Sequence, residues 1–430
     1  MALTHREVRA IVADRLSDWS DRRSSPPSPL EEKAYAAHAL GEEIERMTQD
    51  ALRQGRVPLS EYEEGELRRS VLDALFGLGG LQRYLDDETI ENIVVNGHDV
   101  VWVTHAGGEK RRVDPVAESD AELIELVKRA ARGIGRSERR FDPSSPRLSL
   151  RLPDGSRLFA IMGVSHRPSL SIRRHRFRKE TLADQVGRGT IDPTLASFLQ
   201  AAVRARRNIV IAGGTDAGKT TMLRALLSAI DPLERLVIIE DLAELDLHED
   251  LAAHPDAVSL EERDDNVEGT GRITMADLTR DALRMRPDRV IVGEVRGGEV
   301  LQMLLAMSQG NEGSLCTVHA DSTATAFSRL QFYARFAPER LDDELIKRLI
   351  ATSVHLVVHI ARRADGRRVV TSVRAVSGTT EAGNIASDEL FASGLDGGSA
   401  RPTGTPLMPD LRDRLVSAGF DPSLLVTGWR

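Results

Sequence analysis

One nine-residue segment constrains the fold of this chain more than any other. Residues 213–221 read Gly-Gly-Thr-Asp-Ala-Gly-Lys-Thr-Thr and fit the P-loop pattern Gly-x-x-x-x-Gly-Lys-Ser/Thr. An apolar run over 208–212 precedes the segment and a helical pattern over 221–230 follows it, which is the strand–loop–helix context that the motif requires. Glycines let backbone N–H groups curve around phosphate oxygens, and the helix N-terminus adds a positive field. The segment predicts a nucleoside triphosphate site, with a chance match to the pattern as the alternative.

The polar residues of this loop have separate expected roles. Lys219 can reach the β- and γ-phosphates, and the Thr220 hydroxyl can ligate Mg²⁺. Asp216 is unusual because an acid that points into the loop would repel phosphate, so it either faces solvent or weakens nucleotide affinity. We expect the whole loop to bind the nucleotide through Gly213, Gly214, Thr215, Asp216, Ala217, Gly218, Lys219, Thr220 and Thr221.

The chain around the loop alternates apolar runs with helical patterns from Asp192 onward. The runs cover 208–212, 236–239, 289–292, 315–318 and 354–360. Strands separated by helices predict a parallel, doubly wound sheet and therefore an α/β fold. After Val376 the chain is rich in Gly, Ser, Thr and Pro to about residue 406, and a helical pattern follows over 407–425. We therefore expect a flexible tail over 378–430 with a short C-terminal helix.

Acidic residues follow two of these runs, at the strand ends where such sheets bind ligands. Glu240 and Glu244 come after the run at 236–239 and could hold Mg²⁺ through water or orient the attacking water. An exposed acidic turn is the alternative. Glu294 follows Gly293 at the end of the next run, where many P-loop enzymes place an aspartate. It therefore suits the polarisation of water better than direct Mg²⁺ binding, unless it is an ordinary strand-end carboxylate.

The remaining candidates are a histidine and several arginines. His319 directly follows the run at 315–318 and could hydrogen-bond the γ-phosphate, although a lone histidine is more often satisfied structurally. Cys316 lies inside the same run and is expected to be an inert core thiol. Arginines can stabilise the charge that hydrolysis places on the γ-phosphoryl oxygens. The candidates are Arg157, Arg173 and Arg174 in a basic segment, and Arg286 and Arg296, which we expect near Glu294.

The first 180 residues have a different texture. Residues 1–79 predict a helical extension with a Ser/Pro linker at 20–29. Residues 80–180 predict a small α+β domain, with hairpins at 90–96/100–104 and 148–152/157–161 and a helix at 121–132. From 128 to 180 there are fifteen Lys or Arg and four Asp or Glu, in a chain of net charge −8. A nucleic-acid-binding face is one alternative, but this segment has few aromatic residues on which bases could stack.

Composition excludes several classes of protein. One cysteine excludes an internal disulfide and a four-cysteine zinc site. No apolar run approaches 18 residues and the N-terminus lacks the apolar core of a signal peptide, so we expect no membrane span and a cytoplasmic location.

The order of the motifs resembles that of the secretion-motor ATPases of the type II/type IV secretion superfamily. The signatures are the P-loop at 213–220, the acidic box at 239–245, the Walker B run at 290–294 and the His box at 313–320. Residues 93–97, 144–146, 152–157 and 171–174 are similar to the Tad/Flp-pilus (CpaF-type) branch. A tetracysteine element is missing, which argues against the type II branch, and Asp216 stands where the family usually has Gly or Asn.

The resemblance implies a RecA-like P-loop domain with a parallel sheet over 181–377. It implies a ring of six copies that hydrolyses ATP with Mg²⁺ at the seams between copies, where Arg157, Arg173 and Arg174 match arginines that act across such seams. The expected catalytic residues are Lys219, Glu240, Glu294, Arg296 and His319, and the expected metal-site residues are Thr220, Glu240 and Glu244.

The expected partner is an inner-membrane platform protein, so the motor would be peripheral at the inner face of the cytoplasmic membrane, with no direct nucleic-acid contact. The expected function is to power Tad/Flp-type pilus assembly or protein secretion. The alternatives are a nucleic-acid translocase or conjugative-transfer ATPase on the same core, and a scaffold that binds ATP without turnover.

Overall fold

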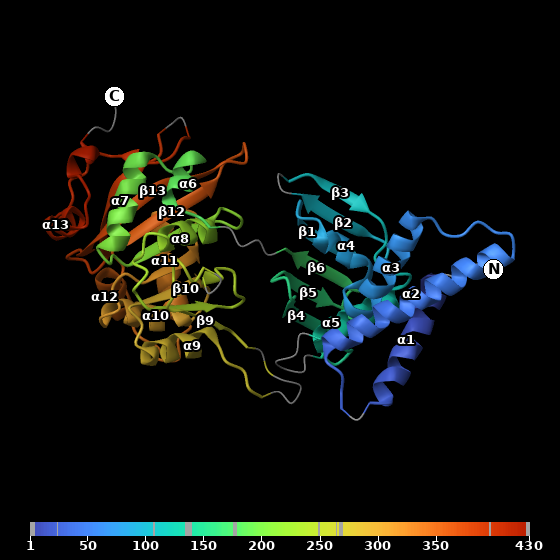
Figure 1. Ribbon diagram of the computed structural model, residues 1–430. Coiled ribbons are helices and arrows are strands. Elements are labelled where there is room, and N and C mark those ends of the chain that lie inside the picture. The colour runs from blue at the N-terminus through green and yellow to red at the C-terminus, as the bar shows by residue number, and fades with distance from the viewer. Residues whose placement is uncertain are drawn as a thin grey trace. The chain divides into compact units, whose positions relative to one another are not determined.

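The chain consists of two compact units, residues 1–176 and 177–430, each with its own sheet and hydrophobic core. The computed structural model describes residues 5–23, 25–105, 108–133, 140–174, 179–247, 250–263, 265, 270–394 and 397–426. The first unit runs from blue to teal and green in Figure 1, and the second runs from green to red. Within the described residues, no helix is long and apolar enough to cross a membrane.

The helical extension begins the first unit and confirms the prediction for this part of the chain. It contains α1 (His5–Asp21), α2 (Pro29–Arg53) and α3 (Glu61–Phe76). Ser28 and Ser60 start α2 and α3 with capping boxes, which satisfy backbone N–H groups that have no partner inside the helix. The three helices share a small core of buried aliphatic side chains, namely Val8, Val12, Ala36, Ala39, Leu40, Ile44, Leu67 and Val71.

The α+β domain of the first unit is built on a six-stranded antiparallel sheet of order β3-β2-β1-β6-β5-β4. Both predicted hairpins are present, as β1–β2 and β4–β5. Two strands were not predicted, and one of them, β6, joins the two hairpins into a single sheet. The elements are η1 (Gly79–Leu81), α4 (Gln82–Asp86), β1 (Ile90–Asn96), β2 (Val101–His105), β3 (Lys110–Val113), α5 (Asp120–Gly133), β4 (Arg147–Arg151), β5 (Arg157–Ile161) and β6 (Ser169–Arg173).

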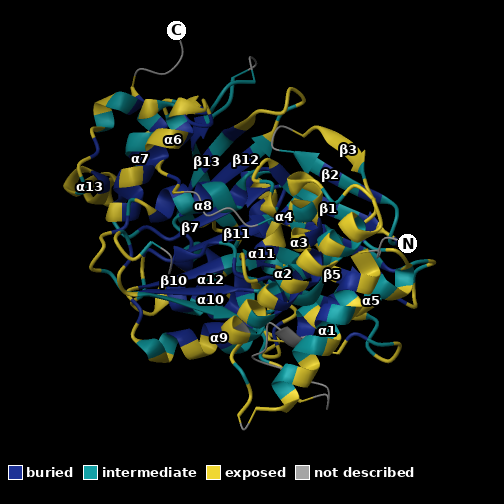
Figure 2. Cartoon of the chain, turned by 45° about the vertical axis from the view of Figure 1, so that its right-hand side comes forward, coloured by how far each residue is buried: buried dark blue, intermediate teal, exposed yellow. Residues whose placement is uncertain are grey.

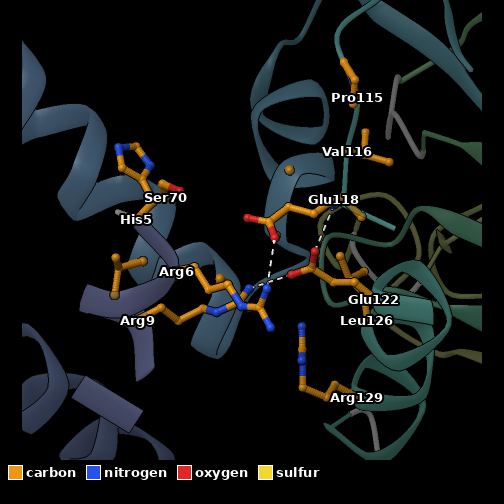
Figure 3. Close-up of a pocket in the computed structure, with 15 residues that line it drawn as sticks. His5, Arg6, Arg9, Ser70, Pro115, Val116, Glu118, Glu122, Leu126 and Arg129 are labelled. Atoms are coloured by element: carbon orange, nitrogen blue, oxygen red, sulfur yellow. Dashed lines mark hydrogen bonds and ion pairs between the residues drawn. The ribbon is translucent and has the colours of Figure 1, made fainter. Parts of the chain in front are cut away.

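The helical extension packs directly on this domain. Directly after the extension, at the start of the α+β domain, a Cβ atom at Gly80 would lie 2.6 Å from the carbonyl oxygen of Val116, so this approach requires glycine. Figure 3 shows a neighbouring cavity of about 320 Å³ between α1, α3 and α5. Arg9 of α1 donates across this cavity to Glu122 of α5 at 2.6 Å. These contacts make the extension and the α+β domain one unit.

The second unit contains a nine-stranded sheet of order β15-β14-β13-β12-β7-β11-β10-β8-β9. The strands from β12 to β9 in this order are parallel, which confirms the predicted α/β fold, and β13, β14 and β15 add an antiparallel edge. Its strands are β7 (Ile209–Gly213), β8 (Leu236–Glu240), β9 (Ala257–Glu261), β10 (Arg289–Val295), β11 (Leu315–His319), β12 (Leu356–Arg362), β13 (Arg368–Thr379), β14 (Ile385–Ala392) and β15 (Arg401–Pro402).

Helices cover both faces of this sheet, so its central strands are dark blue in Figure 2. Alternate residues of β7 face opposite layers: Ile209 and Ile211 contribute to one core, and Val210 and Ala212 to the other. The first layer contains α6 (Leu182–Gly187), α7 (Pro193–Arg204), α8 (Lys219–Leu227) and α13 (Pro409–Ser417). The second layer contains α9 (Met275–Ala282), α10 (Glu299–Ser308), α11 (Thr323–Ala334) and α12 (Asp343–Ser353).

The segment after residue 378 is not the flexible tail that we expected. It forms β14, which pairs with β13 along most of its length, and then α13 and η4 (Pro422–Leu425). Phe391 is fully buried, and its ring centroid lies 5.0 Å from that of Phe198 in α7. The Gly- and Ser-rich composition belongs to strands and turns, and most of the buried apolar residues of this segment join the core that contains Phe198, whereas Ile385 packs against the other core. Residues 395–396 and 427–430 of the expected tail lie outside the described residues.

Candidate active site

The P-loop connects the end of β7 at Gly213 to the start of α8 at Lys219. Two of its residues have left-handed backbone conformations, with φ of +58° at Asp216 and +99° at Gly218. A Cβ atom at Gly213 would lie 2.5 Å from the carbonyl oxygen of Ile360 in β12, so this position requires glycine. The loop therefore has the tight curvature that turns backbone N–H groups toward a phosphate.

Lys219 is the first residue of α8, and its side chain turns back to the loop. Its Nζ donates to the carbonyl oxygen of Gly214 at 3.0 Å and lies 3.2 Å from Nδ1 of His319. Burial lowers the pKa of Lys219, and the nearby Glu294 carboxylate opposes this effect. The lysine is thus partly desolvated next to the loop, where its charge acts more strongly on a phosphate than it would in water.

Glu294 and His319 meet because β10 and β11 are adjacent parallel strands. Oε1 of Glu294 lies 2.6 Å from Nε2 of His319, but the two are not aligned as a hydrogen bond, so Oε1 stays a buried acceptor. Burial lowers the pKa of His319, against the opposing effect of the Glu294 carboxylate. A buried carboxylate oxygen beside a lysine and a histidine has the position and the chemistry to accept a proton from water.

Arg296 holds the other oxygen of Glu294. Its Nη2 donates to Oε2 of Glu294 at 2.7 Å, and its Nη1 donates to Asp241 at 2.9 Å. Burial opposes charge on Arg296, but the hydrogen bonds to the two acids raise its pKa overall. Arg296 therefore fixes the rotamer of Glu294 and ties the end of β10 to the turn after β8.

The turn after β8 brings Glu244 to the P-loop. Thr220 Oγ1 donates to Glu244 Oε2 at 3.0 Å. The Glu240 carboxylate is buried and accepts from the backbone N–H groups of Glu244 and Leu245 at 2.9 and 3.1 Å. We expected Glu240 in a metal–water network, but its carboxylate faces the backbone of the turn and so positions Glu244. Arg224 of α8 adds a bond to the Glu244 carbonyl oxygen.

The donor set at this turn fits a metal ion that is shared with phosphate oxygens. Thr220 and Glu244 supply a hydroxyl and a carboxylate, which are hard oxygen ligands of the kind that Mg²⁺ prefers. Within the part of the chain that the structure describes, no group of three or more His, Cys, Asp or Glu side chains could hold a metal ion alone. Mg²⁺ usually binds through one or two protein ligands together with substrate phosphates, so this arrangement is sufficient.

Asp216 does not stand alone at the surface. Its carboxylate accepts from Arg362 at 2.7 Å and from Arg368 at 2.8 Å. Neither arginine was a candidate from the sequence, and neither was Arg224. Arg362 is 146 residues away from Asp216, so no local pattern connects the two.

The other predicted arginines lie elsewhere. Arg157 and Arg173 are direct cross-strand partners on β5 and β6 of the first unit, and Arg174 follows β6 and donates to the Asp87 carbonyl oxygen. Arg286 was expected near Glu294 but precedes β10, at the other end of the strand. The seven residues of β10 span about 20 Å at about 3.3 Å per residue, which separates the two side chains. Cys316 is buried, as predicted.

Comparison with known proteins shows the family to which this chain is similar. The type II/IV secretion system protein family matches residues 76–389. A Mycobacterium tuberculosis (strain ATCC 25618 / H37Rv) protein, whose name associates it with conjugal transfer, is 36% identical over 307 residues, 70% of this chain and 84% of that protein. The conjugal transfer protein TrbB of Rhizobium radiobacter is 33% identical over 290 residues, 66% of this chain and 83% of that protein.

A secretion-system component is also among the relatives. The type IV secretion system protein VirB11 of Brucella suis biovar 1 (strain 1330) is 31% identical over 313 residues, 66% of this chain and 84% of that protein. The crystal structure of the Brucella suis VirB11 ATPase in complex with sulphate has 29% identity, covers 70% of this chain and 97% of that chain, and has a TM-score of 0.37. The family match covers more than half of the chain and includes the P-loop, Glu294 and His319. The chain therefore belongs to the type II/IV secretion system protein family, and with its P-loop it is an ATPase of that family.

Proposed function

We propose that the chain is a hexameric motor that hydrolyses ATP at the cytoplasmic membrane to power assembly of a Tad/Flp-type pilus or protein secretion. The observation that carries this proposal is the meeting of Lys219, Glu294 and His319 at the carboxyl ends of β7, β10 and β11. A scaffold that only binds nucleotide would not need a buried carboxylate oxygen beside the loop.

Each residue of this group has a separate task in the proposed reaction. Lys219 neutralises charge on the transferred phosphoryl group. Glu294 Oε1 orients the attacking water and accepts its proton, while Arg296 holds the carboxylate in place. His319 lies between Lys219 and Glu294 and contacts the γ-phosphate. Thr220 and Glu244 would hold Mg²⁺, which neutralises part of the phosphate charge when it is bound.

The first unit supplies the residues that we propose to act across a seam between copies. Arg151, Arg157 and Arg173 stand opposite one another on β4, β5 and β6. Like charges directly opposite each other on neighbouring strands are destabilising. Such a row is well suited to bind an anion, and we propose that Arg157, Arg173 and Arg174 reach the nucleotide of a neighbouring copy.

Two observations bear on the machine that the motor drives. Residues 93–97, 144–146, 152–157 and 171–174 are similar to the Tad/Flp-pilus branch, which supports a pilus or secretion platform in the inner membrane as the partner. The conjugal transfer names of two relatives favour the alternative, a conjugative-transfer ATPase or nucleic-acid translocase.

The first experiment measures specific ATPase activity against protein concentration, with and without single-stranded DNA. Lys219→Ala provides the blank, and Glu294→Gln is expected to abolish turnover. Activity that rises with concentration and ignores DNA supports a motor with sites between copies. Activity that does not depend on concentration, or that DNA switches on, favours the translocase. Near-wild-type turnover in Glu294→Gln would exclude the role given to Glu294.

A mixing experiment tests the seam directly. Lys219→Ala and Arg173→Ala are each expected to be inactive, because each removes one side of the proposed composite site. Mixed rings contain seams in which the intact lysine of one copy faces the intact arginine of the next. We therefore expect a mixture of the two variants to regain part of the activity. A mixture as inactive as its components would mean that Arg173 does not act across a seam.

A further inference from the structure

The hairpin between β12 and β13 contacts the P-loop at Asp216. The Asp216 carboxylate accepts one hydrogen bond from Arg362, the last residue of β12, and another from Arg368, the first residue of β13. Nε of Arg368 also donates to the backbone carbonyl oxygen of Asp216 at 3.1 Å. The hairpin thus contacts both the side chain and the backbone of this loop residue.

These contacts bear on phosphate binding because they are made to the backbone of the loop. Asp216 has a left-handed conformation, which aspartate and asparagine adopt more readily than other non-glycine residues. Arg368 also packs on Gly218, where a Cβ atom would lie 2.9 Å from Cδ of Arg368. The same arginine therefore contacts the loop at two residues that have positive φ, immediately before Lys219.

Charge gives the same two arginines a second task. A carboxylate in a phosphate-binding loop repels the phosphates of a nucleotide. The two guanidinium groups make the local charge positive, because two cations and one anion give this cluster a net charge of +1. All three side chains are about half exposed, so each pair alone stabilises the fold little. Their effect is expected on nucleotide affinity, where the repulsion acts.

We propose that Arg362 and Arg368 are positioning residues for the P-loop, which neutralise Asp216 and hold the loop in its phosphate-binding conformation. The inference rests on the proposed function only in that the loop binds a nucleotide. It makes Asp216 a tolerated departure from the usual loop sequence, since its charge is compensated by this hairpin.

The test is a titration with a fluorescent ADP analogue in the presence of Mg²⁺, using the full chain. Arg362→Gln combined with Arg368→Gln leaves Asp216 uncompensated and is expected to weaken the Kd about tenfold. Adding Asp216→Asn to this pair removes the repulsion and is expected to restore most of the affinity. Arg367→Gln is the matched control, because Arg367 lies in the same hairpin and bonds Asp365 instead. This control is expected to bind like the wild type.

Each result of this series decides the proposal. Wild-type affinity in the double arginine variant would overturn it. Failure of Asp216→Asn to rescue affinity would also overturn it, since the lost affinity would then not come from the uncompensated charge of Asp216. Thermal unfolding of each variant guards against loss of folding, and rescue by a third substitution cannot come from a chain that fails to fold.

The series also separates this inference from the proposed function. The measured quantity is nucleotide binding, not hydrolysis. A chain that binds nucleotide without hydrolysing it would refute the proposed motor function, but the arginine variants would still test the role of Arg362 and Arg368. A wild-type chain that does not bind the analogue would refute both.

Discussion

The structure changes the role of Glu240, and a single substitution tests the change. Glu240 is 3% exposed, and its carboxylate accepts from the N–H groups of Glu244 and Leu245. Glu240→Gln keeps the size of the side chain but removes the charge. Its NH2 group cannot accept the hydrogen bond that Oε2 of Glu240 accepts from the backbone N–H of Leu245 at 3.3 Å. A Glu240 carboxylate that served only as a metal ligand would be an unpaired buried charge in the absence of the metal ion. Its neutralisation would then not lower the stability of the chain.

The two roles predict opposite signs for the change in stability. A hydrogen bond to a charged group contributes about 1.5–3 kcal/mol, so losing one in Glu240→Gln is expected to lower the free energy of unfolding of the second unit by about that amount. For 150–250 residues, each kcal/mol shifts Tm by roughly 2–4 °C, so we expect Tm to fall by roughly 3–12 °C. ATPase activity is expected to fall as well, because Glu244 loses its support beside Thr220.

The assay is thermal unfolding of the full chain without nucleotide. The transition of the second unit is identified by its rise in Tm when ADP is added. Asp241→Asn is the matched control from the same turn. Its carboxylate is 37% exposed and bonds Arg296, so its removal should cost less than about 1 kcal/mol. A Glu240→Gln chain as stable as the wild type would refute the turn-holding role and return Glu240 to the metal–water network.

Three further predictions follow from burial. Phe391→Ala should lower the free energy of unfolding by about 3–5 kcal/mol. Val416→Ala, at a residue 47% exposed, should change it by less than about 0.5 kcal/mol. Equal effects of the two variants in urea denaturation would show that residues 385–392 do not pack on the core. Burial lowers the pKa of His355 from 6.5 to about 4. The neutral imidazole therefore contributes its full share to the free energy of unfolding above pH 6.5. This contribution falls as the pH drops toward 4, because only the unfolded chain then binds the proton. The loss should reach about 3 kcal/mol and vanish in His355→Gln; an unchanged pH slope in that variant would refute the assignment. Burial lowers the pKa of His319 below 6.5, so kcat should fall only below that pH, when an imidazolium would bind Glu294, and a His319→Gln chain with the same acid limb would contradict this.

The amino-acid sequence by itself determined the features that depend on neighbouring residues. The P-loop is contiguous, so its glycines, Lys219 and Thr220 are recognisable without any knowledge of the fold. The alternation of apolar runs with helical patterns indicated the parallel sheet, and that sheet topology places Glu294 and His319 at one edge. The two hairpins of the first unit were also predictable, because their turn residues lie between their strands.

Only the tertiary structure decided which remote groups meet. Residues after 378 have the composition of a loop, but pairing of β14 with β13 satisfies their backbone and buries Phe391. The partners of Asp216 lie on a hairpin about 146 residues further along the chain, and Glu240 faces a backbone turn whose conformation no residue pattern specifies. Hydrogen bonds and ion pairs of this kind depend on distances of about 3 Å between segments that only the packed sheet brings together. Spacing along the chain carries no record of such distances, and the local motifs therefore predicted the reaction centre but not the residues that hold it in place.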